Sequence, residues 1–121
     1  MNQCLVVDDS RTIRRAIIAT MKDLSFEFQE AGDGLEAIEK CKSRMPYLII
    51  LDWNMPNMTG IEFLRNLRRM SGGEKPKVIL CTTETGLNFI QEALKCGADE
   101  YIMKPFTNEI IKEKLKLLRI I

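Results

Sequence analysis

Short apolar runs alternate with helical patterns along the chain. Five runs have strand-like composition, and each is followed by a stretch in which apolar residues recur every three or four positions. The predicted strands are residues 4–7, 26–30, 47–51, 78–81 and 101–103, and the predicted helices are residues 10–24, 35–43, 60–70, 87–95 and 107–118. This alternation predicts an α/β fold, a doubly wound five-stranded parallel sheet with helices on both faces.

Capping and turn residues separate these elements. Ser10 and Thr107 carry hydroxyl groups suited to cap the helices that they begin. Pro46 ends the second helical pattern, and Gly97 suits a left-handed helix end. The core-facing sides are expected to contain Ile13, Ala16, Ile17, Thr20, Met21 and Leu24 in the first helix, Leu35, Ile38 and Cys41 with Lys42 in the second, and Ile61, Phe63, Leu64 and Leu67 in the third.

Composition limits the function classes. The 121 residues, 45% hydrophobic and 29% charged, are typical of one globular domain. A net charge of +1 without basic clusters argues against nucleic acid or an anionic membrane as a partner. The absence of histidine excludes an intramolecular histidine acid–base mechanism and removes the main ligand of the usual zinc sites. Without a signal peptide or a membrane-length apolar run, we expect a cytoplasmic protein.

Chemically active side chains follow four of the predicted strands directly. These residues are Asp8, Asp9, Asp52, Thr82, Thr83 and Lys104. The carboxyl ends of parallel strands meet at one edge of a sheet, where open α/β sheets bind their ligands. Carboxylates that lie close together repel each other unless a cation offsets their charge, and Mg²⁺ prefers carboxylate and phosphate oxygens. The sequence therefore predicts a pocket for a divalent cation and a phosphoryl group.

Five motifs in a fixed order extend over essentially the whole chain. They are V-D-D-S at 7–10, D-W-N-M-P-N-M at 52–58 closed by Gly60, T-T-E at 82–84, C-G-A-D at 96–99 and Y-I-M-K-P-F at 101–106. In these residues the chain resembles the receiver domain of bacterial response regulators, most closely the single-domain chemotaxis type. The resemblance implies a flavodoxin-like strand order 2-1-3-4-5 and one receiver domain, residues 1–121, with no output domain.

The same resemblance assigns roles at the sheet edge. Asp52 is expected to accept a phosphoryl group from a sensor histidine kinase, a histidine phosphotransfer protein or acetyl phosphate. Asp8, Asp9 and Asp52, with the main-chain carbonyl of Asn54, are expected to hold Mg²⁺. Lys104 would pair with Asp52 before the reaction and with a phosphoryl oxygen after it. The peptide bond between Lys104 and Pro105 is expected to be cis.

A switch also follows from the resemblance. Thr82 would turn its hydroxyl group toward the acyl phosphate, and Tyr101 would then turn inward. Asn54 and Glu84 stand at the two positions that tune dephosphorylation in receivers. Trp53, beside the acceptor, should report metal and phosphate binding by fluorescence. Two residues depart from the usual pattern: Thr83 replaces a small alanine, and Thr59 replaces a frequent acidic residue.

Three functions remain open at this point. The first is a monomeric binding switch that docks on a protein target, in chemotaxis or motility, through residues 87–95, Tyr101 and the helix around residues 113–115. The second is a phosphotransfer intermediate or phosphate sink in another two-component pathway. The third is a magnesium-dependent phosphatase, which Asn54 disfavours because it stands where a second acidic residue would be needed. In the first two functions the chain is no enzyme beyond its own phosphorylation and autodephosphorylation.

Overall fold

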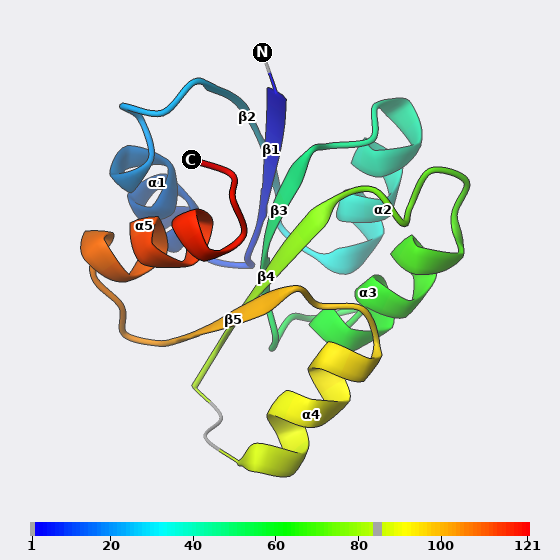
Figure 1. Cartoon of the computed structure of the whole chain (residues 1–121). Coiled ribbons are helices and arrows are strands. Elements are labelled where there is room, and N and C mark those ends of the chain that lie inside the picture. The colour runs from blue at the N-terminus through cyan, green and yellow to red at the C-terminus, as the bar shows by residue number, and fades with distance from the viewer. Residues whose placement is uncertain (1, 84–85) are drawn as a thin grey trace.

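Five strands alternate with five helices in the computed structural model, which describes residues 2–83 and 86–121 (Figure 1). The strands are β1 (Asn2–Val7), β2 (Phe26–Ala31), β3 (Leu48–Asp52), β4 (Lys77–Thr82) and β5 (Glu100–Met103). The helices are α1 (Arg11–Thr20), α2 (Gly34–Ser43), α3 (Gly60–Arg69), α4 (Leu87–Lys95) and α5 (Asn108–Leu117). Within the described residues, no helix is long and apolar enough to cross a membrane.

All strand pairs are parallel, and the sheet has the order β2-β1-β3-β4-β5. The expected fold class and strand order are confirmed. Val7 pairs with Leu51 between β1 and β3, and Thr82 pairs with Met103 between β4 and β5. Because these pairs lie at the carboxyl ends of their strands, the residues that follow them emerge side by side. The register therefore brings the predicted chemistry to one edge of the sheet.

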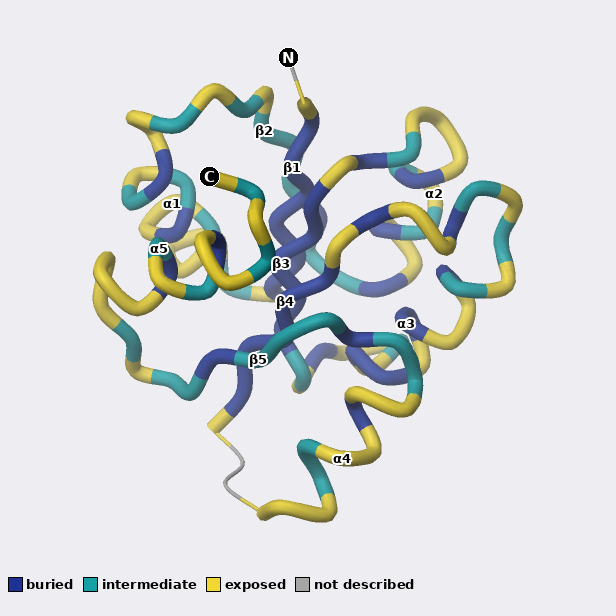
Figure 2. The backbone as a smooth tube through the Cα atoms, viewed as in Figure 1, coloured by how far each residue is buried: buried dark blue, intermediate teal, exposed yellow. Residues whose placement is uncertain are grey.

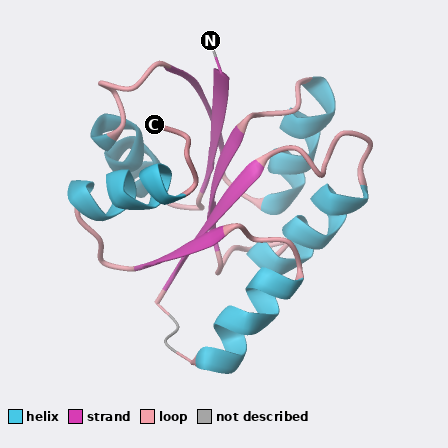
Figure 3. Ribbon diagram, viewed as in Figure 1, coloured by secondary structure: helices cyan, strands magenta, loops and turns pink. Residues whose placement is uncertain are grey.

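A helical layer covers each face of the sheet (Figure 3). Buried residues of α2, α3 and α4 pack on one face and those of α1 and α5 on the other. Successive residues of a strand contribute to opposite layers, as Leu5 and Val6 do in β1. The strands β1, β3 and β4 are buried along most of their length, whereas the outer faces of the helices are exposed (Figure 2). This burial on both faces explains why the central strands are almost wholly apolar.

Helix starts follow local chemistry. The hydroxyl groups of Ser10 and Thr107 accept hydrogen bonds from main-chain N–H groups in the first turns of α1 and α5, as predicted. Thr59 caps α3 in the same way, and Glu62 bonds back to the Thr59 N–H group at 3.0 Å. Thr59 thus has a structural role that the departure from the family pattern alone did not indicate.

Two sequence expectations about helices were wrong. The first helix ends at Thr20 rather than near Leu24, because Met21 and Leu24 continue the apolar spacing through tight turns after the helix. Leu35 and Lys42 were expected on the buried side of α2, yet Leu35 is 53% exposed and Lys42 is exposed as well. The other two expected residues do face the core, Cys41 buried and Ile38 partly buried, together with the small residues Gly34 and Ala37. Gly34 is so close to Met58 that a Cβ atom would lie 2.7 Å from that side chain.

A partly buried arginine ties α3 to two neighbouring loops. Arg68 donates to the main-chain carbonyls of Gly73 and Pro76, each at 2.9 Å, and to that of Gly97 at 2.6 Å. It also pairs with Asp99 at 3.2 Å. Gly97 has a φ of +110°, and a Cβ atom there would lie 2.8 Å from the Arg68 side chain. Glycine is therefore needed both for its conformation and for the close approach of the arginine.

Candidate functional site

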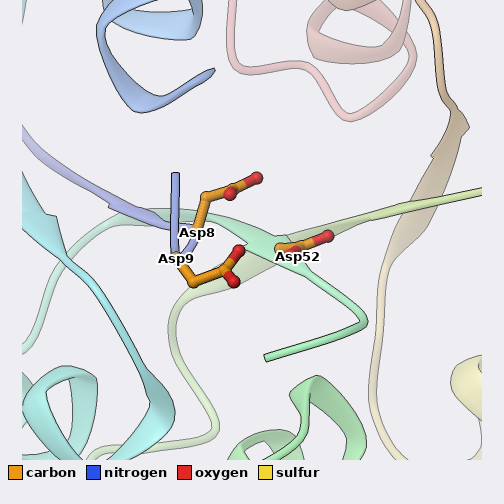
Figure 4. Close-up of side chains that lie close together, drawn as sticks. All are labelled: Asp8, Asp9 and Asp52. Carbon is orange, nitrogen blue, oxygen red and sulfur yellow. The ribbon is translucent and has the colours of Figure 1, made fainter. Parts of the chain in front are cut away.

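Three carboxylates gather where β1 and β3 end (Figure 4). One oxygen atom from each of Asp8, Asp9 and Asp52 lies within 4.8 Å of the others. Asp8 and Asp52 are only 3% and 7% exposed, whereas Asp9 is exposed to solvent. The expected cluster is thus assembled from residues 44 positions apart by parallel pairing of the two strands.

Lys104 lies against two of these carboxylates. Its Nζ atom is 2.8 Å from Oδ1 of Asp52 and 3.2 Å from Oδ2 of Asp8. The main-chain N–H group of Lys104 donates to the Thr82 carbonyl at 2.8 Å, which extends the pairing of β4 and β5 by one residue. The bond between Lys104 and Pro105 is cis, as the family pattern implied. The expected pair of Lys104 with Asp52 is present, and its contact with Asp8 was not foreseen.

The site carries more negative than positive charge. Burial raises the pKa of Asp52, and the neighbouring Asp8 and Asp9 charges act in the same direction, although the hydrogen bond from Lys104 opposes them. Burial lowers the pKa of Lys104, but the hydrogen bond and charge of Asp52, together with Asp8, outweigh this and raise it. One ammonium therefore faces three carboxylates, and a second cation would stabilise their ionised forms.

The structure fixes Asp8 more firmly than Asp9. Asp8 accepts a hydrogen bond from the Ser10 N–H group at 2.9 Å through Oδ1, in addition to the contact with Lys104 through Oδ2. Its main-chain carbonyl accepts from Arg14 at 2.7 Å. The Asp9 carboxylate has no hydrogen-bond or ion-pair partner among the described residues. Sequence reasoning missed Arg14, because a basic residue in an amphipathic helix gives no signal of such a contact.

The donor set fits a hard divalent cation. All three side chains offer carboxylate oxygens, and the exposed Asp9 keeps its oxygens available. Oxygen ligands of this kind suit Mg²⁺ or Ca²⁺ rather than zinc or copper. The cluster can therefore hold a divalent metal ion at the sheet edge.

Of the two expected switch residues, Thr82 ends β4 at the same sheet edge as the cluster, whereas Tyr101 pairs with Leu80 further along the sheet. Thr82 is 2% exposed at the end of β4, and Tyr101 is half-buried in β5. The Nζ atom of Lys114 lies 5.1 Å from the centre of the Tyr101 ring, from the α5 side. Of the two residues expected to tune dephosphorylation, Asn54 is exposed just beyond β3, and Glu84 lies outside the described residues.

A ring contact and a groove lie on opposite sides of the cluster. The rings of Trp53 and Phe89 lie 3.5 Å apart between their centres, so the residue after Asp52 touches α4. On the opposite side, a largely apolar groove of about 460 Å³ lies between α1 and the start of α5. Thr83 is exposed and lines this groove together with Lys104 and Phe106. The α4 side thus touches the residue that follows Asp52, and the groove on the α1 side reaches Lys104.

Comparison with known proteins agrees with this architecture. Residues 4–116 match the family described as the response regulator receiver domain, and the chain belongs to that family. The chemotaxis protein CheY1 of Helicobacter pylori is 42% identical, over 94% of both chains. The chemotaxis protein CheY homolog of Campylobacter jejuni is also 42% identical, over 93% of this chain and 88% of that protein. The solved structure of the chemotaxis response regulator CheY4 of Vibrio cholerae superposes with a TM-score of 0.91 at 36% identity, covering 98% of each chain.

Proposed function

We propose that this receiver domain accepts a phosphoryl group on Asp52 and, in that state, binds a protein target. The observation that carries the proposal is the buried Asp52 carboxylate, 2.8 Å from the Lys104 ammonium within a cluster of three carboxylates. A carboxylate oxygen of Asp52 would attack the phosphorus atom of a kinase phosphohistidine or of acetyl phosphate, and the bond from phosphorus to the donor would break. Positioning and charge stabilisation supply most of the catalysis in such transfers.

Asp8, Asp9, Asp52 and the Asn54 carbonyl are the groups that would hold Mg²⁺. When bound, the cation would offset the charge of the carboxylates and of the phosphoryl oxygens. Asp8 is already held by Ser10 and Lys104, whereas Asp9 has no such partner among the described residues, so Asp9 is the more available ligand. Lys104 would keep its contact with Asp8 while its bond to Asp52 is exchanged for one to a phosphoryl oxygen.

Thr82 and Tyr101 would carry the change to the surface. Thr82 ends β4 beside the cluster, and its carbonyl is already bonded to the Lys104 N–H group. Its hydroxyl would bond to the acyl phosphate, and Tyr101 would then turn inward between α4 and α5. Phosphorylation favours a target only through different affinities for the two states, so a tenfold preference needs about 1.4 kcal/mol. One new ion pair and one hydrogen bond are of that size.

The output surface would be the face of α4, β5 and α5. It combines the exposed Leu87 and Leu94 with Tyr101 and Lys114. The chemotaxis names of the relatives favour a target in motility signalling over a phosphate sink. The chain would act as a monomer in the cytoplasm, where its phosphodonors form, and its chemistry would be limited to its own aspartate and to hydrolysis of the acyl phosphate. Asn54 and Glu84 would set the rate of that hydrolysis.

Labelling tests the acceptor. Acetyl phosphate with Mg²⁺ should add one phosphoryl group to the wild-type protein, measured by intact-mass spectrometry. Asp52→Asn and Asp52→Ala should abolish the addition because the attacking carboxylate is gone. Asp23→Asn is the matched control, since Asp23 is exposed and pairs with Lys112 away from the site. Stoichiometric labelling of Asp52→Ala would falsify the assignment.

A second experiment tests the coupling to α4. Beryllofluoride should shift the main-chain amide NMR signals of residues 87–95 in the wild-type protein. Lys104→Ala and Thr82→Ala should still bind the phosphoryl mimic to some degree, but with the α4 shifts reduced severalfold. Lys112→Ala, a surface lysine, is the control. Equal α4 shifts in wild type and both site variants would contradict the switch, as would identical partners at identical affinity in pull-downs with activated and inactive protein.

A further inference from the structure

Arg14 bridges the start of α1, the end of β1 and the end of β2. Its Nη1 atom donates to the main-chain carbonyl of Asp8 at 2.7 Å, and its Nε atom donates to Oε1 of Glu30 at 2.9 Å. The side chain is only 15% exposed. Arg14 thus contacts the loop that carries two of the three clustered carboxylates without touching the carboxylates themselves.

We propose that Arg14 is a positioning residue for the cation site, acting through the peptide group that joins Asp8 to Asp9. This inference rests on the proposed binding of Mg²⁺. A peptide group is planar, so fixing the Asp8 carbonyl also fixes the direction of the Asp9 N–H group and hence of the Asp9 backbone. Because the Asp9 carboxylate has no partner of its own among the described residues, the backbone is what holds it in place before a cation binds.

The surrounding contacts explain why the peptide group matters more for Asp9 than for Asp8. Asp8 is held by its N–H group, which donates to the Ala31 carbonyl at 3.1 Å, and by both carboxylate oxygens, which contact Ser10 and Lys104. Loss of Arg14 would leave these three contacts intact. Asp9 has no comparable contacts, so without Arg14 its backbone and side chain would sample more conformations. Binding a cation would then have to order Asp9, and this entropy cost would make binding weaker.

An arginine suits this role because its planar fork can hold two acceptors at once. Glu30 orients the guanidinium and offsets its charge, which would otherwise repel a divalent cation. Arg15 is a matched control on the same helix. Its side chain is 60% exposed, and its Nε atom is 3.8 Å from Oε2 of Glu30. Arg15 thus carries the same charge near the same carboxylate but makes no hydrogen bond to the Asp8 carbonyl.

A purely electrostatic role and a positioning role of Arg14 predict opposite changes in Mg²⁺ affinity when Arg14 is replaced. Removing a positive charge near the site should tighten Mg²⁺ binding through electrostatics, and salt should screen this effect. Removing the hydrogen bond to Asp8 should weaken binding at any ionic strength. The experiment titrates Mg²⁺ into wild type, Arg14→Gln and Arg15→Gln, at low and high salt. Trp53 fluorescence and the Asp9 amide NMR shift are the readouts.

Arg14→Gln should weaken Mg²⁺ binding by about tenfold at both salt concentrations, the lower end of what outer-shell partners of metal ligands contribute. Arg15→Gln should leave the affinity unchanged or slightly tighter at low salt. Arg14→Lys, which keeps the charge and one donor, should restore part of the affinity. Glu30→Gln should weaken binding less than Arg14→Gln, because the bond to Asp8 remains. Thermal unfolding by circular dichroism identifies any variant that does not fold.

Equal or tighter Mg²⁺ binding by folded Arg14→Gln, relative to Arg15→Gln, would overturn the inference and leave the proposed function standing. If Arg14→Gln does not fold, Arg14→Lys and Glu30→Gln decide, and wild-type affinity in both would likewise overturn it. A wild-type protein that gives no Mg²⁺ response would remove the proposed function, and the inference with it. The two failures are therefore distinguishable.

Discussion

Arg68 and Lys104 are two partly buried cations in different surroundings. Their side chains are 19% and 22% exposed. Arg68 faces three main-chain carbonyls and a single carboxylate, Asp99, which also accepts from the Val78 N–H group at 2.8 Å. Lys104 contacts two carboxylates directly, Asp8 and Asp52, and an oxygen atom of the third, Asp9, lies within 4.8 Å of theirs. The arginine thus meets mostly neutral acceptors, and the lysine meets a surplus of negative charge.

This difference separates a structural cation from a reactive one. The hydrogen bonds of Arg68 pair it with each of its acceptors and join α3 to the segments around β4 and β5. The site around Arg68 therefore needs no additional ion to balance its charge. The Lys104 cluster is stable only to the extent that one ammonium can offset three carboxylates. A cluster with uncompensated negative charge is stabilised when a metal ion binds. It is also where a perturbed pKa is expected, and the pKa of Asp52 is raised.

The largest expected effect is the loss of stability in Arg68→Ala. Three carbonyls and Asp99 would lose their donor, and we expect the free energy of unfolding to fall by about 3 kcal/mol. Urea unfolding, followed by circular dichroism, measures it. Arg69→Ala, on the exposed side of the same helix turn, should change stability by less than about 0.5 kcal/mol. A similar loss in both variants would show that Arg68 is not a structural tie.

A smaller effect, a loss of Mg²⁺ affinity of more than about tenfold (about 1.4 kcal/mol), is expected for Asp9→Ala, and it should exceed the loss in Arg14→Gln because a ligand is removed outright. The oxygens of Asp9 are available, whereas those of Asp8 already contact Ser10 and Lys104, so Asp8→Ala should weaken binding less. Trp53 fluorescence provides the titration, with Asp23→Asn as the control. An unchanged titration in Asp9→Ala would rule out its role as a ligand.

The smallest effect concerns the pH dependence of stability. Burial raises the pKa of Asp52, so its ionisation destabilises the metal-free fold. Asp52→Asn should therefore be more stable than wild type at neutral pH when no metal ion is present, by less than the two effects above. The difference should shrink in acid, as pH falls through the pKa of folded Asp52, and saturating Mg²⁺ should reverse it. Equal stabilities of wild type and Asp52→Asn in metal-free buffer at neutral pH would contradict the surplus of negative charge.

The sequence was sufficient to predict those parts of the fold and site in which the residues that form the local pattern also make the tertiary contacts. The apolar runs that form β1, β3 and β4 are buried on both faces, so their limits were readable within one or two residues. The carboxylate cluster was predictable because its members directly follow those runs. The capping box of Thr59 and Glu62 could have been found from their spacing, since a hydroxyl residue and a glutamate three positions later are its signature.

Other features depend on contacts between distant segments, which no local pattern contains. Arg14 reaches Glu30, and Arg68 reaches Asp99, 31 positions away. In α2 the apolar spacing identified the buried Cys41 and the packed Ile38 correctly but failed for Leu35, which is exposed, and it gave no sign of the close approach of Gly34 to Met58. Met21 is buried although α1 has already ended, because a turn can continue the spacing of a helix.

The contact of Trp53 with Phe89 complicates the use of the natural fluorophore. The indole follows Asp52 in sequence and touches α4 through that ring. Its emission therefore combines two inputs, the charge state of the neighbouring carboxylates and the placement of a helix on the expected output surface. A titration curve from Trp53 can contain both, and replacing Phe89 with leucine would separate ligand occupancy from helix displacement within a single optical signal.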